Sequence, residues 1–130
     1  GSSKVAVNLH EGIDSTVMIL RHRLKANDSR PEIQIIKHYG NIPPVKCYPG
    51  QLNQVFMNVL ANAIDALEEA NSGRSFADIQ ANPNQITITT EVTADRQQVA
   101  IKIRDNGLGI SEEVKARIFD HLFTTKSLGK

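Results

Sequence analysis

The sequence predicts an α+β protein built as a two-layer sandwich, in which a sheet carries its helices on one face. Two observations support this fold class. Apolar residues recur at three- and four-residue steps in two long segments, as in helices, and they alternate along three others, as in strands. The chain of 130 residues shows no repeat or low-complexity tract, and it is long enough to bury the core of one domain.

The first half of the chain is expected to hold a helix, a strand and a turn region. Apolar spacing predicts a helix that begins near Leu9 and ends before the breaker stretch at residues 27–31. Residues 32–40, EIQIIKHYG, alternate like a strand. Residues 41–50, NIPPVKCYPG, are interpreted as a turn region, because consecutive prolines cannot continue a sheet ladder.

The second half is expected to hold a buried helix and a hairpin. The helix runs from about Gln51 to Ala70, and a polar loop follows over residues 71–84. Residues 85–105 read as two strands around a short turn at Ala94 to Arg96. Residues 111–113, Ser-Glu-Glu, then predict the start of another helix, because acidic side chains are favourable at the positive end of the helix dipole.

The composition argues against several classes of function. With 15 basic and 14 acidic residues, the chain has no overall charge that would attract nucleic acid, and Arg21, Arg23 and Lys25 are interpreted as a solvated helix face. The single cysteine, Cys47, excludes an internal disulfide and favours a reducing, cytoplasmic compartment. No apolar run approaches a membrane span, so we expect no membrane contact by this domain.

The glycine-rich stretch DNGLG, residues 105–109, does not match two familiar phosphate loops. A dinucleotide-binding fingerprint needs a small residue at position 112, where this chain has Glu112. A P-loop that ended at Gly129 and Lys130 would need a glycine where Thr124 stands. The stretch therefore needs another explanation.

The helix over residues 51–70 carries a polar line along its apolar body. The line consists of Gln54, Asn58, Asn62, Asp65 and Glu69, since steps of three and four return to one side of a helix. An ordinary solvent face is one interpretation. The other is a site for a hard cation, because asparagine is a weak helix former and amide oxygens suit Mg²⁺.

Strand periodicity places Asp105 on an inward face with Val99, Ile101 and Ile103. A buried carboxylate is costly unless it accepts hydrogen bonds. It is satisfied either by a tight Asp-Asn-Gly turn that ends the strand, or by a donor on a ligand, such as the exocyclic amine of adenine. Glycines directly after it would let a flat ligand approach the backbone.

Three motifs in order resemble a known family. They are Asn58-Val-Leu-Ala-Asn62-Ala63, then Asp105-Asn-Gly107-Leu-Gly109-Ile110, then Phe119-Asp-His-Leu-Phe123-Thr124-Thr125-Lys126. They look like the N, G1 and F boxes of the histidine-kinase catalytic domain, and the resemblance extends over most of the chain. It implies the Bergerat ATP-binding fold, a two-layer α/β sandwich with a mixed sheet, and a function as the ATP-binding catalytic domain of a two-component sensor histidine kinase.

The resemblance also implies ATP and Mg²⁺ as cofactors and gives roles to individual residues. Asp105 would accept a hydrogen bond from the adenine amine, Gly107 and Gly109 would shape the base pocket, and Ile110 would line it. Asn62 would coordinate the Mg²⁺ that bridges the phosphates, and Asn58 would support that arrangement from one turn earlier. Asp65, on the same line, would act only indirectly. A mobile ATP lid would include Phe123, Thr124 and Lys126, whose lysine offers positive charge to phosphate.

The residue at position 58 bears on the reaction. ATPases and serine kinases with this fold usually carry a glutamate there as general base. The neutral amide of Asn58 cannot take a proton, which favours γ-phosphoryl transfer to a histidine, already a good nucleophile. The implied partners are the dimerisation and phosphoacceptor domain of the same kinase and a downstream response regulator.

Some features depart from the family. His10 is interpreted as an ordinary surface residue rather than a phosphoacceptor, and the four histidines show no metal-ligand spacing. Residues 1–3 resemble a cloning remnant, and residues 4–130 are expected to be an incomplete catalytic domain that stops before the second glycine box. We therefore expect this piece alone to be inactive, and an unpaired strand edge to favour self-association. The alternative is an interaction module with the same fold that binds nucleotide weakly or not at all.

Overall fold

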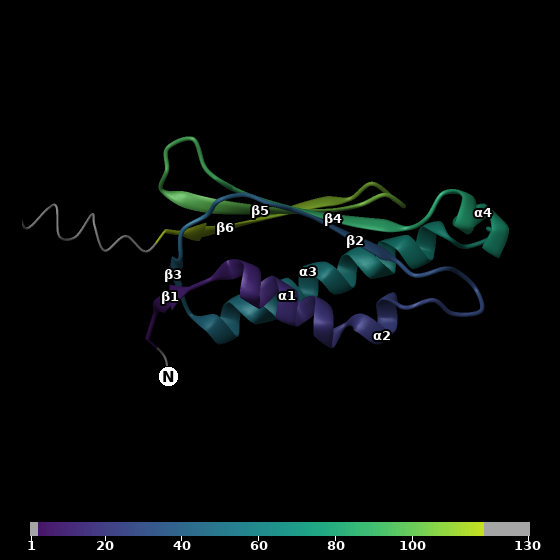
Figure 1. Ribbon diagram of the computed structural model, residues 1–130, viewed down its shortest axis with the longest axis horizontal. Helices are drawn as coiled ribbons and strands as arrows, with labels where there is room; N and C mark the ends of the chain where they lie inside the picture. The colour runs from purple at the N-terminus through teal and green to yellow at the C-terminus, as the bar shows by residue number, and fades with distance from the viewer. Residues whose placement is uncertain (1–2, 119–130) are drawn as a thin grey trace, which may run out of the picture.

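The computed structural model describes residues 3–118, in which a sheet lies over a layer of helices (Figure 1). The elements follow in the order β1 (Val5–Val7), α1 (Leu9–Ile19), α2 (Arg21–Leu24), β2 (Gln34–Tyr39), β3 (Val45–Cys47), α3 (Pro49–Ala70), α4 (Phe76–Ala81), β4 (Gln85–Val92), β5 (Gln98–Asp105) and β6 (Ser111–Arg117). The long helix α3 runs beneath the sheet, and α1 packs beside it.

The main sheet is mixed. Its four strands lie in the order β2-β4-β5-β6, with β2 parallel to β4 and the two remaining pairs antiparallel. A separate two-stranded sheet pairs β1 with β3. The helices α1 and α3 cover one face of the main sheet, so the predicted two-layer α+β sandwich is confirmed (Figure 1).

The core lies between α3 and the inner face of the sheet. Alternate residues of β4 and β5 point into it, as the strand period requires. α3 contributes its apolar side, and α1, which packs beside α3, adds its own buried residues. The largest fully buried side chains include Phe56, Leu60, Ile64, Leu67, Ile86, Ile88, Ile101, Ile103, Leu9 and Ile13.

The predicted hairpin and the two long helical segments are present. The turn between β4 and β5 contains Arg96 at a φ of 61°, in the left-handed region. The first helical segment is divided at Leu20, whose ψ of 5° ends α1 before the short α2 begins. The boundaries therefore shift by a few residues while the element types hold.

The prediction of a helix starting at residues 111–113 is wrong, because this segment forms β6. It alternates between inward and exposed positions, with Val114 and Ala116 turned towards the core. Its exposed Glu113 lies opposite Lys102 of β5, with 3.9 Å between the charged groups. Pairing along seven residues of β5 and this inward apolar pair outweigh the helix-start signal.

The sequence interpretation missed three further elements, β1, β3 and α4. The turn region at residues 41–50 contains β3, whose partner β1 lies about forty residues away and had no signal of its own. The polar loop at 71–84 contains α4, which starts with a capping box: Asp78 N–H donates to Ser75 Oγ (3.1 Å) and Ser75 N–H to Asp78 Oδ2 (3.3 Å).

Two side chains expected to be plain surface residues are engaged. The ring of His10 stacks on Tyr39 with centroids 3.9 Å apart, and its Nε2 lies 2.8 Å from Thr90 Oγ1. Burial lowers the pKa of His10, and the nearby Asp14 only partly opposes that effect.

Arg23 donates to Asp65 (2.9 Å) and Glu68 (2.8 Å), so it ties α2 to α3 instead of facing solvent alone.

Candidate functional site

The predicted polar line of α3 is exposed along its whole length. Gln54, Asn58, Asn62, Asp65 and Glu69 are all exposed, whereas the buried residues of α3 are Leu52, Phe56, Leu60, Ala63, Ile64, Ala66 and Leu67. Gln54 Nε2 donates to Asn58 Oδ1 over 3.3 Å. Asp65 forms an ion pair with Arg23. Asn58 and Asn62 present exposed amides in the middle of α3.

Asp105 lies at the end of β5 and is 1% exposed, as its strand position predicted. Its carboxylate accepts three hydrogen bonds from the loop that follows it. Oδ1 accepts from the N–H groups of Gly107 and Gly109, each over 3.0 Å, and Oδ2 accepts from Ile110 N–H over 3.1 Å. Since a carboxylate offers about four acceptor positions, Oδ2 retains room for one further donor.

Of the two interpretations left open for Asp105, the tight turn is therefore present in the structure. The backbone of the loop satisfies this buried charge, and Asp105 N–H in turn donates to Ile110 O over 3.2 Å. This closure leaves the second interpretation, a donor from a ligand, compatible with the remaining position on Oδ2.

Glycine is favoured at the two positions of this loop for different physical reasons. A Cβ on Gly107 would lie 2.9 Å from Ala70 Cβ and 3.3 Å from Leu67 Cα, so only glycine lets the loop lie against α3. Gly109 has a φ of +75°, which side chains disfavour. Between them Leu108 is 48% exposed, and Ile110 after them is 49% exposed, which leaves apolar surface on the loop.

The loop after β5 contacts α3, the helix that carries the exposed amides. Gly107 abuts α3 at Leu67 and Ala70, and Asn62 lies five residues before Leu67, or about 7.5 Å along the axis. Ala63 and Ala66, with the partly buried Ala70, lie on the side of α3 between the exposed Asn62 and the Gly107 contact. Because these side chains are small, no bulky group of α3 stands between the amides and the loop.

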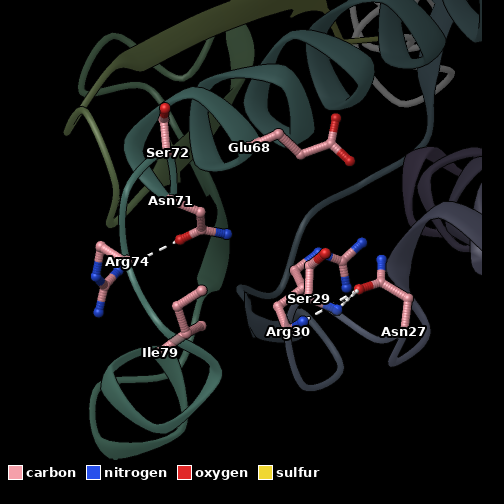
Figure 2. A pocket seen from close by; sticks show the side chains of 8 residues that line it. All are labelled: Asn27, Ser29, Arg30, Glu68, Asn71, Ser72, Arg74 and Ile79. Carbon is pink, nitrogen blue, oxygen red and sulfur yellow. Dashed lines mark hydrogen bonds between the residues drawn. The ribbon is translucent and has the colours of Figure 1, made fainter.

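A polar pocket of about 360 Å³ lies at the C-terminal end of α3 (Figure 2). One wall is the loop from Asn27 to Arg30, and the other is the end of α3 with Asn71 and Ser72. Arg30 is 4% exposed, and its guanidinium donates to the carbonyls of Arg23, Lys25 and Pro31. None of the predicted site residues lines this pocket.

Residues 3–118 contain no group of three His, Cys, Asp or Glu side chains that could hold a metal ion by themselves. A cation here would thus rely on other oxygen donors, and Asn58 and Asn62 offer amide oxygens, which suit Mg²⁺. Within the same residues no helix is long and apolar enough to cross a bilayer. The predicted lid residues Phe123, Thr124 and Lys126 lie outside the described part of the chain.

Comparison with known proteins gives a family for this arrangement. Residues 47–130 match the model of the histidine kinase-, DNA gyrase B-, and HSP90-like ATPase family, a match that contains Asn58 and Asn62 of α3 and the loop after β5. The chain belongs to this ATPase family. Its mixed sheet with helices on one face is accordingly the Bergerat fold.

The relatives of this ATPase domain come from the histidine-kinase branch. The chain is 30% identical to sporulation kinase E of Bacillus subtilis over 88% of its own length and 13% of the relative. It is 38% identical to the signal transduction histidine-protein kinase AtoS of Escherichia coli, over 95% of its length and 17% of the relative. It is 29% identical to the sensory histidine kinase/phosphatase NtrB of Rhizobium meliloti, over 97% and 32%. The chain thus spans between 13% and 32% of the length of these kinases.

Proposed function

We propose that the protein containing this chain is a cytoplasmic sensor histidine kinase, in which this domain binds Mg-ATP and supplies the γ-phosphoryl group to a histidine. The acceptor would lie on a separate dimerisation domain, and a response regulator would receive the phosphoryl group afterwards. The observation that carries the proposal is the amide of Asn58, exposed one turn before Asn62 on α3. It offers no general base to activate water, and a histidine nitrogen needs none.

Each residue of the site has a proposed role. Asn62 would ligate Mg²⁺ through its amide oxygen, and Asn58 would support the metal and the phosphates. Oδ2 of Asp105 would accept a hydrogen bond from the adenine amine, at its remaining acceptor position. Gly107 and Gly109 would shape the base pocket, with Ile110 lining it, and Phe123, Thr124 and Lys126 would form the lid.

Bound Mg²⁺ would neutralise charge on the β- and γ-phosphates as the phosphoryl group leaves. The contribution of the chain is positioning: α3 fixes the two amides on one line, and the closed loop fixes the carboxylate. The apolar surface of Leu108 and Ile110 suits the flat face of a base.

The proposal is tested by isothermal titration of the 130-residue chain with a non-hydrolysable ATP analogue and Mg²⁺. We expect saturable binding that Asn62→Ala weakens, mainly by removing the dependence on Mg²⁺. Asn53→Ala is the matched control, because Asn53 is exposed on the same helix and about 180° away from Asn62. Equal effects of the two substitutions would contradict the metal role of Asn62.

A second function has one observation in its favour. The Asp105 carboxylate is 1% exposed and already accepts three N–H groups, so the loop is complete without nucleotide. A chain that gave a folded circular-dichroism spectrum but no heat of binding would support an interaction module acting through protein contacts. Acid-labile, alkali-stable phosphorylation of the full-length parent incubated with Mg-ATP would support the kinase.

A further inference from the structure

The loop after β5 is anchored by a residue that the proposed function leaves without a role. Asn106 Oδ1 accepts a hydrogen bond from Gln85 N–H over 2.8 Å, and Asn106 Nδ2 donates to Pro83 O over 2.9 Å. Its own N–H donates to Gln85 O over 3.1 Å. Three hydrogen bonds therefore attach Asn106 to the segment of residues 83–85, which ends with the first residue of β4.

That segment is in turn attached to the end of α3. Asn84 is 2% exposed, and it exchanges two hydrogen bonds with Asn71: Asn71 Nδ2 donates to Asn84 Oδ1 (2.7 Å), and Asn84 Nδ2 donates to Asn71 Oδ1 (3.1 Å). Asn71 is the C-cap residue of α3, and Figure 2 shows it at the end of that helix. Asn71, Asn84 and Asn106, here called the asparagine bridge, thus connect α3 to the loop after β5.

The chemistry at position 106 requires an amide. The side chain meets an N–H group and a carbonyl oxygen on one neighbouring segment, so it must accept and donate at once. A carboxylate could accept from Gln85 but would place lone pairs against Pro83 O. An alanine would make neither bond.

The loop is also limited from the other side. Gly107 already lies so close to Ala70 that a Cβ between them would be 2.9 Å from its neighbour, and the loop cannot move further towards α3. Asn106 ties the loop to Pro83 and Gln85 as well. Asp105 is the last residue of β5 and pairs with Ile86 of β4, and its carboxylate is oriented by N–H groups of this loop.

We propose that Asn106 is a positioning residue for nucleotide binding: the asparagine bridge holds the loop against α3 and so fixes the Asp105 carboxylate relative to Asn62. The inference rests on the proposed function for its effect on affinity. Asn106 itself would not touch the nucleotide, because its amide is occupied by Pro83 and Gln85.

Two measurements on the 130-residue chain test this inference. The first is amide hydrogen exchange without ligand, in which Asn106→Ala should speed exchange at Gly107, Gly109 and Ile110 and leave Ile101, in the middle of β5, unchanged. The second is the Kd for the ATP analogue AMP-PNP with Mg²⁺. Without these two bonds the loop should occupy its binding-competent position only a minority of the time, which predicts a Kd roughly tenfold higher, with the Mg²⁺ dependence retained.

Two further variants make the test decisive. Asn106→Asp keeps the acceptor for Gln85 but sets its carboxylate against Pro83 O, so it should also speed loop exchange and raise the Kd, and it replaces Asn106→Ala if that variant does not fold. Asn82→Ala, at an exposed asparagine two residues before Asn84, should match the wild type. Wild-type exchange at the loop, or an unchanged Kd in a folded Asn106→Ala chain, would overturn the inference. A wild-type chain that binds no nucleotide would instead refute the proposed function.

Discussion

Gly107 lies so close to α3 that alanine at this position should destabilise the fold. The added Cβ would be 2.9 Å from Ala70 Cβ, 3.2 Å from Leu67 Cδ2 and 3.3 Å from Leu67 Cα. Leu67 is fully buried and its Cα belongs to the helix backbone, so only small adjustments are available. Forcing one carbon into such packing costs about 1–3 kcal/mol.

The substitution also has an opposing effect. Glycine to alanine reduces the freedom of the unfolded chain, which stabilises the fold by about 0.4–1 kcal/mol where the backbone permits it. The expected net loss for Gly107→Ala is therefore about 0–2.6 kcal/mol in the free energy of unfolding, centred on about 1.3 kcal/mol. The matched control is Gly50→Ala in the first turn of α3, where an added Cβ meets nothing within 4 Å and should stabilise the protein.

Urea unfolding followed by circular dichroism measures both free energies. A double-mutant cycle then identifies the contact. Ala70→Gly removes the nearest atom, so Gly107→Ala should cost clearly less in that background than in the wild type. If Gly107→Ala stabilised the chain as Gly50→Ala does, the loop would not lie against α3 as described, and the argument for its position would fail.

Three further predictions concern the rest of the fold. Asn84→Ala should lower the free energy of unfolding by about 1–3 kcal/mol, because it removes the acceptor of Asn71 Nδ2. In urea unfolding, the double variant with Asn71→Ala should cost less than the sum of the two single variants. Burial lowers the pKa of His10 in the folded state, so the unfolded state binds more protons and stability should fall as the pH drops through the unfolded value of about 6.5. Thermal unfolding should show that a His10→Gln chain lacks this loss of stability. A chain with His38→Gln, a change at an exposed histidine, should keep it. Arg23→Ala should cost no more than about 1 kcal/mol at low salt, and less at 1 M NaCl, because the pairs to α3 are partly exposed; a salt-independent loss would point to packing.

The features predicted from sequence are those with strong local periodicity. α3 combines a wide apolar side with an exposed polar line, and both follow from the 3.6-residue repeat. The hairpin of β4 and β5 alternates with period two, which also placed Asp105 correctly in the interior. In α3 and in this hairpin the structure agrees with the local pattern, because residues close together in the sequence determine both.

The missed features depend on distant partners or on short signals. β3 has three residues between prolines and a helix, and it is a strand only because β1 lies beside it. β6 carries a helix-start signal at Ser111, yet the free side of β5 offers it a ladder. The capping box of α4 was readable in the sequence, as serine followed three residues later by aspartate.

The candidate site divides in the same way. Sequence alone indicated the line of Asn58 and Asn62 and the inward Asp105, because each follows from one period. It gave no sign of the hydrogen bonds that Asn106 makes to Pro83 and Gln85, since these join segments more than twenty residues apart. Such contacts become visible only when the sheet register is known.

The parallel pairing of β2 with β4 has a consequence for the order of folding. The hairpin of β4 and β5 closes a short loop, but Gln34 must find Gln85, which lies 51 positions later in the chain, beyond β3, α3 and α4. Closing the longer loop costs more chain entropy, and that cost is recovered only when α3 has packed against the sheet. We therefore expect the hairpin with α3 to form the folding nucleus and β2 to join last, so that substitutions in β2 would chiefly speed unfolding.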